Sequence, residues 1–189
     1  MGKREKGGTI SRIDFPAIYD FFYNNCLRFR VTDINFQRML RLAEEFFETK
    51  HDPLQITVDE ETTALLRQIH PSAMSEVKNQ DGPIAWVLVI PTTRDLMNQF
   101  VAGEIDEREL LFRTPLNASY DALYLCSALV LPEFRRKGTA KRLVMKAVSA
   151  IRDEHPIKYL FYWEFSADGK ALASSIAQEA HLPLLARQP

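Results

Sequence analysis

The sequence has few cysteines and no long apolar run, and each shortage excludes a class of protein. Cys26 and Cys126 are the two cysteines in 189 residues, and they are too far apart to match a metal-ligand spacing. We expect both to be free core thiols in a reducing compartment. No apolar run reaches the ~18 residues that span a bilayer, and residues 1–12 are not followed by the apolar segment of a secretory signal. These absences predict a cytoplasmic protein, without a membrane segment, whose residues 1–12 form a disordered arm.

An excess of one charge sign is also missing. The chain has 24 basic and 25 acidic side chains and a formal net charge of −1, which argues against a general nucleic-acid binder. The four histidines show no metal-ligand spacing, so no metal site is predicted. With 46% hydrophobic residues, the composition is that of a globular protein. The length and the lack of a linker predict a single domain over residues 13–189.

The apolar pattern predicts alternating strands and helices. Continuous apolar runs bounded by turn signals or prolines predict buried strands, at 82–93, 120–132 and 157–165. Apolar residues at helical spacing predict helices, at 33–53, 58–71, 140–156 and 166–181, with a further helical stretch at 92–112 that Gly103 interrupts. The aromatic-rich stretch 15–29 fits either a short helix or an irregular buried piece. Together these elements predict an α/β (α+β mixed) fold in which helices cover a sheet.

The stretch "LPEFRRKGTAKRL" (131–143) gathers basic residues between a strand and a helix. The start of a helix leaves backbone N–H groups without partners and favours negative charge. Gly138 allows the backbone to take a positive φ and to approach a ligand closely. Cations ahead of a helix oppose its dipole, so an anionic ligand such as a pyrophosphate is favoured over a merely solvated turn. A nucleic-acid backbone contact through 134–142 is a third interpretation, which the near-neutral net charge disfavours.

The same stretch resembles a known family. Arg135-x-x-Gly138-x-Ala140 matches the [QR]-x-x-G-x-[GA] signature of the GNAT superfamily of acyl-CoA-dependent N-acyltransferases. The resemblance covers 120–181 well and 84–112 loosely. It implies a mixed, mostly antiparallel sheet flanked by helices, with a V-shaped slot for acetyl-CoA between the strands at 122–131 and 157–165. It also implies an N-acetyltransferase that acts on a small-molecule or peptide amine, and it raises a homodimer as one arrangement.

The resemblance assigns cofactor-binding roles by position. It implies that backbone groups of Ala128, Leu129 and Val130 face the pantetheine arm of coenzyme A. The amide after a strand bulge, near Val130, would stabilise the oxyanion. The resemblance also implies cofactor-binding roles for residues of the basic turn, which are Arg135, Arg136, Lys137, Gly138, Thr139, Ala140 and Lys141. In the last helix it implies such roles for Asp168 and Ala171. The backbone N–H groups from Arg136 to Lys141 would hold the pyrophosphate.

The catalytic residues are less clearly marked. Glu164, Asp121 and Tyr124 stand where some members of the family place a base. Ser175 replaces the tyrosine that acts as an acid in many members, so a non-catalytic acyl-CoA-binding domain is an alternative prediction. Acceptor specificity is expected in the first 80 residues and in 92–112. The acidic residues of that stretch, Asp106, Glu107 and Glu109, fit either attraction of a cationic amine or a solvated helix face.

Overall fold

The computed structural model describes residues 34–48, 56 and 60–187 of the chain. The predictions for 1–12, for 15–29 and for Cys26 lie outside these residues. The described chain contains one five-stranded sheet whose strands follow one another in sequence order. The strands are β1 (Met74–Asn79), β2 (Gly82–Thr92), β3 (Ala122–Val130), β4 (Tyr159–Trp163) and β5 (Leu184–Arg187).

The sheet is mixed. β1, β2 and β3 pair antiparallel, whereas β3, β4 and β5 pair parallel. The antiparallel ladders are the longer ones, and the predicted mixed fold is confirmed. The sequence analysis missed the two edge strands. β1 is half-exposed and polar in composition, and β5 is only four residues long, so neither carries the apolar run that marks the three central strands.

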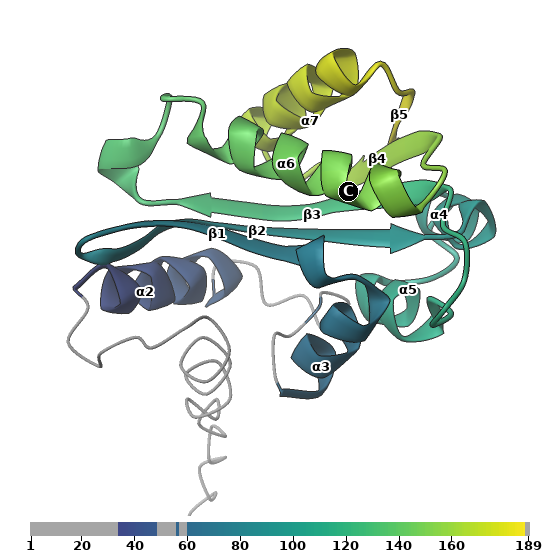
Figure 1. Cartoon of the computed structure of the whole chain (residues 1–189), viewed down its shortest axis with the longest axis horizontal. Coiled ribbons are helices and arrows are strands. Elements are labelled where there is room, and N and C mark those ends of the chain that lie inside the picture. Colours follow the sequence, from purple (N-terminus) through teal and green to yellow (C-terminus); the bar gives the residue numbers. More distant parts are fainter. Residues whose placement is uncertain (1–33, 49–55, 57–59, 188–189) are drawn as a thin grey trace, which may run out of the picture.

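Helices cover both faces of the sheet (Figure 1). They are α2 (Ile34–Glu48), α3 (Glu60–Ile69), α4 (Arg94–Val101), α5 (Glu107–Arg113), α6 (Thr139–Glu154) and α7 (Ala167–Ala180). α6 and α7 lie on one face, and α2, α3 and α5 lie on the other. The predicted helices are present; α3 ends at Ile69, two residues before its predicted end, and the predicted ends of α2 lie outside the described residues. No helix of the described chain is long and apolar enough to cross a membrane.

Two sets of capping residues divide the helical stretch after β2 into α4 and α5. The hydroxyl of Thr93 accepts a hydrogen bond from the N–H of Leu96 and begins α4. The chain then turns at Gly103, where φ is +77°. Asp106 and Glu109 form a reciprocal capping box that begins α5, as expected for an acidic residue three positions after an N-cap. This box fixes the position of Glu107 in the first turn of α5.

A slot opens where β3 and β4 part. The two strands pair only from Ala122 with Tyr159 to Tyr124 with Phe161. β3 then continues to Val130 paired with β2 as its one strand partner among the described residues. The edge of β3 that faces away from β2 therefore has no strand partner beyond Tyr124 among the described residues, and its peptide groups are available to a ligand.

Candidate active site

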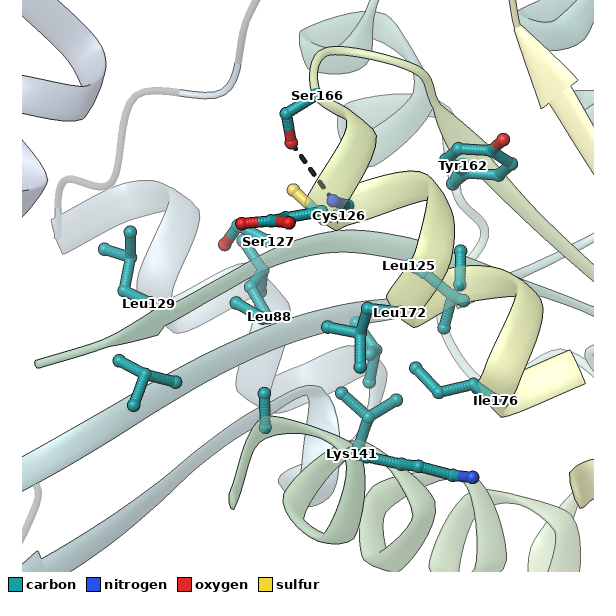
Figure 2. Close-up of a pocket in the computed structure, with 18 of the residues that line it drawn as sticks. Leu88, Leu125, Cys126, Ser127, Leu129, Lys141, Tyr162, Ser166, Leu172 and Ile176 are labelled. Carbon is teal, nitrogen blue, oxygen red and sulfur yellow. Dashed lines mark hydrogen bonds between the residues drawn. The ribbon is translucent and has the colours of Figure 1, made fainter. Parts of the chain in front are cut away.

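A cavity of about 660 Å³ occupies the slot between the second half of β3, the end of β4 and the first turns of α6 and α7. Figure 2 shows side chains from β3, α6 and α7 converging on it. On the opposite face of the sheet the cavity reaches Leu42 of α2, Ile56 and Glu107 of α5. It therefore connects the α6/α7 face with the α2/α5 face through the opening beside β3.

The peptide groups of β3 alternate between β2 and the slot. The N–H of Leu131 donates to the carbonyl oxygen of Ile84, at 3.0 Å. In an antiparallel ladder the next hydrogen-bonded position is two residues away, so the peptide of Leu129 faces β2. The peptides of Ala128 and Val130 face the slot, and the Val130 carbonyl oxygen accepts a hydrogen bond from Nε of Arg135, at 2.9 Å. Two of the three residues assigned to the pantetheine arm thus present their backbone to the cavity.

The bulge in β3 lies earlier than the sequence analysis placed it. Leu88 is opposite Ser127 and Val89 is opposite Leu125, so Cys126 is the extra residue. The prediction of a bulge near Val130 was wrong, because the run from 122 to 130 carries no glycine, and pairing with β2 decides where the irregular position falls. The bulge lies directly after the point where β4 departs.

The basic turn forms one mouth of the cavity. Gly138 precedes α6 with φ +72°, and no side chain caps the helix. Arg136 also has a positive φ, +58°. A Cβ at Gly138 would approach Nη1 of Arg142 to 3.0 Å, and that guanidinium donates to the carbonyl oxygen of Lys137, at 2.8 Å. The uncapped N–H groups at the start of α6 and the small side chains of the next two residues leave this end open to an anion.

Two ion pairs lie beside the mouth of the cavity. Arg38 of α2 forms two hydrogen bonds with Glu133, at 2.5 and 2.7 Å. This guanidinium holds the pKa of the Glu133 carboxyl at about 2. Lys141 binds Glu179 of α7, at 2.7 Å, so its ammonium is turned toward α7. Arg135 and Arg136 are exposed and line the cavity at this end.

The other end of the cavity is built around a buried carboxylate. Glu107 is 5% exposed. Its Oε2 accepts a hydrogen bond from the N–H of Ile56, at 3.0 Å, and its Oε1 accepts one from the hydroxyl of Tyr124. The thiol of Cys126 lies 3.6 Å from the same oxygen. Burial raises the pKa of Glu107, and burial together with the charge of Glu107 raises the pKa of Cys126 well above its ordinary value.

The candidate catalytic residues from the sequence analysis lie in different places. Tyr124 is fully buried and contacts Glu107. Asp121, at the opposite end of β3, accepts a hydrogen bond from the N–H of Arg94, at 2.7 Å. Glu164 pairs with Lys170, at 2.9 Å, just beyond β4. Asp121, Glu164 and Ser175 are absent from the cavity lining, so the structure does not bring these three together with the slot.

The last helix contributes fewer of the predicted contacts than expected. Asp168 lines the cavity, whereas Ala171 is exposed and does not. The apolar lining of this helix comes from Leu172, Ala173 and Ile176. These residues face the slot at helical spacing, so Ser175, which is half-buried, falls on another side of α7.

Glu107 is the site residue that sequence reasoning did not separate from its neighbours. Its burial depends on Ile56 and on β3, which are distant in sequence. The capping box around it was visible as Asp106-x-x-Glu109, but such a box predicts only where a helix begins. No local pattern distinguishes Glu107 from the exposed acidic residues beside it.

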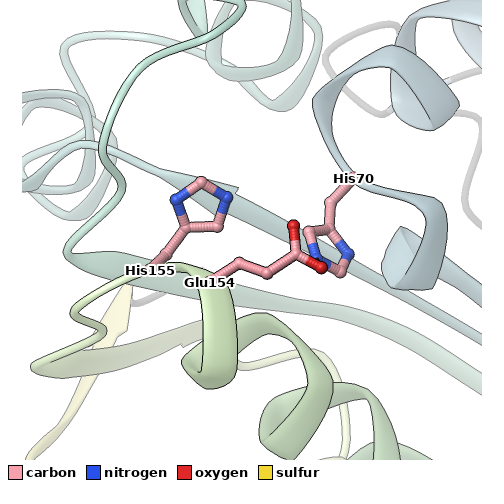
Figure 3. Close-up of side chains that lie close together, drawn as sticks. All are labelled: His70, Glu154 and His155. Atoms are coloured by element: carbon pink, nitrogen blue, oxygen red, sulfur yellow. The ribbon is translucent and has the colours of Figure 1, made fainter.

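His70, Glu154 and His155 form a second cluster (Figure 3), at the end of α6 opposite to the one that lines the slot. Their ligand atoms lie within 4.8 Å of one another, a grouping that resembles a metal site. Nδ1 of His70, however, accepts a hydrogen bond from the N–H of Ser72, at 2.9 Å. A neutral His70 therefore has its proton on Nε2, which lies 3.6 Å from Glu154 and faces it as a donor. A metal-bound histidine donates its other N–H, so this arrangement does not fit a metal ligand.

Comparison with known proteins assigns the family. The profile described as "Acetyltransferase (GNAT) family" matches residues 36–173. The chain belongs to the GNAT acetyltransferase family and is an N-acetyltransferase. A comparison with curated proteins finds no match.

Two similar solved structures are also acetyltransferases. One is the aminoglycoside acetyltransferase meta-AAC0020 from an uncultured soil metagenomic sample, in complex with trehalose. It is 16% identical, with a TM-score of 0.44, and the match covers 77% of this chain and 79% of that one. The other is Naa20 of Chaetomium thermophilum in complex with a bisubstrate analogue. It is 18% identical, with a TM-score of 0.46, and the match covers 80% of this chain and 67% of that one.

Proposed function

We propose that this chain transfers the acetyl group of acetyl-CoA to a primary amine by direct attack of the amine on the thioester. The observation that carries the proposal is the continuous cavity from the uncapped start of α6, along the free edge of β3, to a buried carboxylate on the opposite face. A long donor needs one end that holds its phosphates, an edge that holds its arm and an opening where the acceptor meets the thioester.

The residues present fit coenzyme A. The N–H groups at the start of α6 are free of a side-chain cap, and Arg135 and Arg136 lie beside them, which suits a pyrophosphate. The slot-facing N–H and carbonyl of Ala128 and the N–H of Val130 offer the donors and the acceptor that an amide-containing arm requires, while the Val130 carbonyl oxygen accepts a hydrogen bond from Arg135. Acetyl-CoA would supply an activated acyl group as a thioester.

Direct attack is favoured over an acyl-enzyme route by the state of Cys126. This thiol lines the cavity, and burial beside Glu107 raises its pKa well above the ordinary value. A thiol nucleophile reacts as the thiolate, so Cys126 is held in its unreactive form. An amine that enters from the α2/α5 face can reach the slot without an intermediate carrier.

The experiment is a measurement of free-thiol release from acetyl-CoA with a panel of amines, with mass spectrometry of the products. We expect an amine-dependent release of thiol and a product heavier by one acetyl group. Binding of acetyl-CoA without thiol release for any amine would favour the non-catalytic alternative that the position of Ser175 raises.

Gly138→Asp tests the location of the donor. The substitution adds a negative charge at the anion-binding turn and a Cβ at a positive φ, so we expect acetyl-CoA binding and thiol release to be lost. Gly103→Asp is the matched control, because Gly103 also has a positive φ, +77°, and has nothing within 4 Å of an added Cβ. Equal loss of binding in both variants would contradict the proposed donor site.

A further inference from the structure

The buried carboxylate of Glu107 lies at the end of the cavity remote from the basic turn. Apart from Asp168 on α7, Glu107 is the acidic residue among the described residues that line the cavity. It belongs to α5, on the face of the sheet opposite α6 and α7 (Figure 1). The acetyl donor is proposed to enter from the α6 side. The Glu107 end is therefore the entrance that remains for the acceptor.

The carboxylate lies beside the bulge of β3. Its partners are the hydroxyl of Tyr124, immediately before the parting of β3 from β4, and the thiol of Cys126, the bulged residue itself. The free edge of β3 starts at this point, so Glu107 lies next to the part of the slot where the thioester end of an extended arm would reach. Neither of the two predicted catalytic carboxylates, Asp121 and Glu164, lines this cavity.

Glu107 has capacity for a further hydrogen-bond donor. Each oxygen of a carboxylate has two lone pairs. Oε2 receives the N–H of Ile56, and Oε1 receives the hydroxyl of Tyr124 and lies near the thiol of Cys126. These partners are neutral. Arg187 of β5 acts on the carboxylate electrostatically, while its guanidinium donates to the carbonyl oxygen of Ile105, at 2.7 Å. Buried charges in proteins are normally paired, and a cation that enters this pocket would pair with an anion whose direct hydrogen-bond partners are neutral.

We propose that Glu107 is the catalytic residue that receives the ammonium group of the acceptor and removes its proton, and that the acceptor carries this ammonium on an uncharged, apolar stem. The inference rests on the proposed function. The stem is assigned from the apolar side chains that line the same cavity as Glu107, which include Ile56, its hydrogen-bond partner, and Leu42 and Leu88. A second charge on the stem would lie against these apolar side chains without a partner, at a cost in free energy.

The proton and electron transfers balance with these groups alone. The acceptor enters as R–NH3⁺, and one proton passes to the Glu107 carboxylate, leaving R–NH2. The nitrogen lone pair forms the C–N bond at the thioester carbonyl carbon, and the C–S bond breaks with its electron pair left on sulfur. A second amine proton passes to that sulfur. The products are R–NH–CO–CH3 and the free thiol, and Glu107 returns its proton to water.

The environment of Glu107 suits this role. Burial raises the pKa of the carboxyl, while Tyr124, Ile56, Cys126 and the charge of Arg187 oppose the rise. A base with a raised pKa binds a proton more strongly at neutral pH than an exposed glutamate does. The rate is therefore expected to fall as the pH decreases through the pKa of Glu107.

The test compares Glu107→Gln with Glu104→Gln, an exposed residue nearby. Three amines serve as probes: 2-phenylethylamine, a C-terminally amidated tripeptide of apolar residues with a free amino terminus, and the polycation spermidine. For Glu107→Gln we expect kcat/KM to fall by roughly 100-fold to 10,000-fold and the acidic decline in rate to disappear, with no change for Glu104→Gln. Wild-type kcat/KM should be highest for one of the two apolar-stem probes, which separates a small amine from a peptide terminus.

A second variant and a binding measurement separate the loss of the base from the loss of donor binding. Glu107→Asp retains the charge but retracts it by one methylene, and should recover part of the activity and keep the acidic decline. Stabilisation by acetyl-CoA should be the same in wild type and Glu107→Gln. Unchanged kcat/KM in Glu107→Gln, with normal acetyl-CoA binding, would overturn the inference and leave the proposed function intact. A preference for spermidine would overturn the assigned stem. No acetylation of any probe by the wild type would count against the proposed function itself.

A readout that is independent of activity follows from the burial of the same carboxyl. Because its pKa is raised in the folded state, the free energy of unfolding should increase as the pH falls through that pKa toward the ordinary value for glutamate. Glu107→Gln, which is never charged, should lack this increase. The same increase in wild type and Glu107→Gln would show that Glu107 is not the buried ionisable group described here.

Discussion

The two ends of the cavity differ in the groups that carry charge and in how far those groups are buried. At the α6 end, backbone N–H groups and exposed cations are placed to bind the negative charge of a ligand. Gly138 and Arg136 have positive φ there. At the α5 end, the charge is a single buried side chain, held by Tyr124 and by the N–H of Ile56. The first end is open to solvent and its determinants lie within a few residues of one another. At the second end the carboxylate is buried but lines the cavity, and its partners come from distant parts of the chain.

The two ends should therefore differ in their sensitivity to substitution. Exposed cations around a phosphate contribute little individually, since water and salt screen them, so the α6 end can lose one without failing. A buried carboxylate depends on every hydrogen bond that it accepts, because an unsatisfied buried charge is costly. Substitutions at the α5 end should therefore have larger and more pH-dependent effects than charge substitutions at the α6 end.

Tyr124→Phe should have the largest effect of the substitutions that leave Glu107 and Gly138 in place. It removes the hydroxyl that donates to Glu107, and a hydrogen bond to a charged group contributes about 1.5–3 kcal/mol. We expect the free energy of unfolding to fall by this amount where Glu107 is ionised, and by less at lower pH. The decline in rate should move to higher pH, because the charged carboxylate loses a donor. Chemical denaturation and rate measurements across pH test both.

Tyr120→Phe is the matched control for that experiment. The hydroxyl of Tyr120 donates to the neutral carbonyl oxygen of Pro115, at 2.7 Å, and its ring is equally buried. We expect a loss of about 0.5–1.5 kcal/mol, with no shift in the rate profile. Equal and pH-independent losses in the two variants would remove the distinction between the buried anionic end and an ordinary core hydrogen bond.

Arg136→Gly should have opposite effects on stability and on binding. Arg136 has φ +58°, a conformation that costs a side-chain-bearing residue about 1–2 kcal/mol, which glycine avoids in part at an entropic cost of its own. We expect the free energy of unfolding to rise by up to about 1 kcal/mol and acetyl-CoA affinity to fall about fivefold or less, with the difference reduced by salt. Denaturation and titration calorimetry at two salt concentrations measure these effects.

Lys137→Gly separates charge from backbone conformation in the same turn. It removes one cation from a residue that is not among those with positive φ. Because Arg136 lines the cavity and Lys137 does not, the loss of affinity should be no larger than that of Arg136→Gly, whereas stability should fall by roughly 0.5–1 kcal/mol. A stability loss in Arg136→Gly as large as in Lys137→Gly would contradict the strain assigned to Arg136.

Arg38→Met should have the smallest effect. Arg38 and Glu133 are exposed, and the guanidinium holds the pKa of Glu133 at about 2. The ion pair therefore contributes stability above the ordinary glutamate pKa, and this contribution is lost as the pH falls through about 2. In Arg38→Met the pKa of Glu133 should return toward 4.5 with little change in melting temperature. Carboxyl NMR titration measures the shift, and Arg41→Met, on the exposed side of α2, should leave Glu133 unchanged.

The sequence was informative where structure is locally determined. The three central strands, the start of α6 at Gly138 and the division of 92–112 at Gly103 follow from apolar runs, capping residues and glycine. The edge strands and the bulge at Cys126 were not predicted, because pairing with a neighbouring strand decides them. Glu107 was seen as one of three acidic residues. Only the packing of Ile56 and β3 distinguishes it from Asp106 and Glu109.

The central claim is that the α6 end of the cavity holds acetyl-CoA. Thermal unfolding with and without acetyl-CoA, with ATP as the control anion, tests it most directly. A ligand at 100 times its Kd adds about 2.7 kcal/mol, which raises the melting temperature of a chain of this size by roughly 5–10 °C. We expect this rise for wild type and Glu107→Gln, and its loss in Gly138→Asp. No rise with millimolar acetyl-CoA, or an equal rise with ATP, would contradict it.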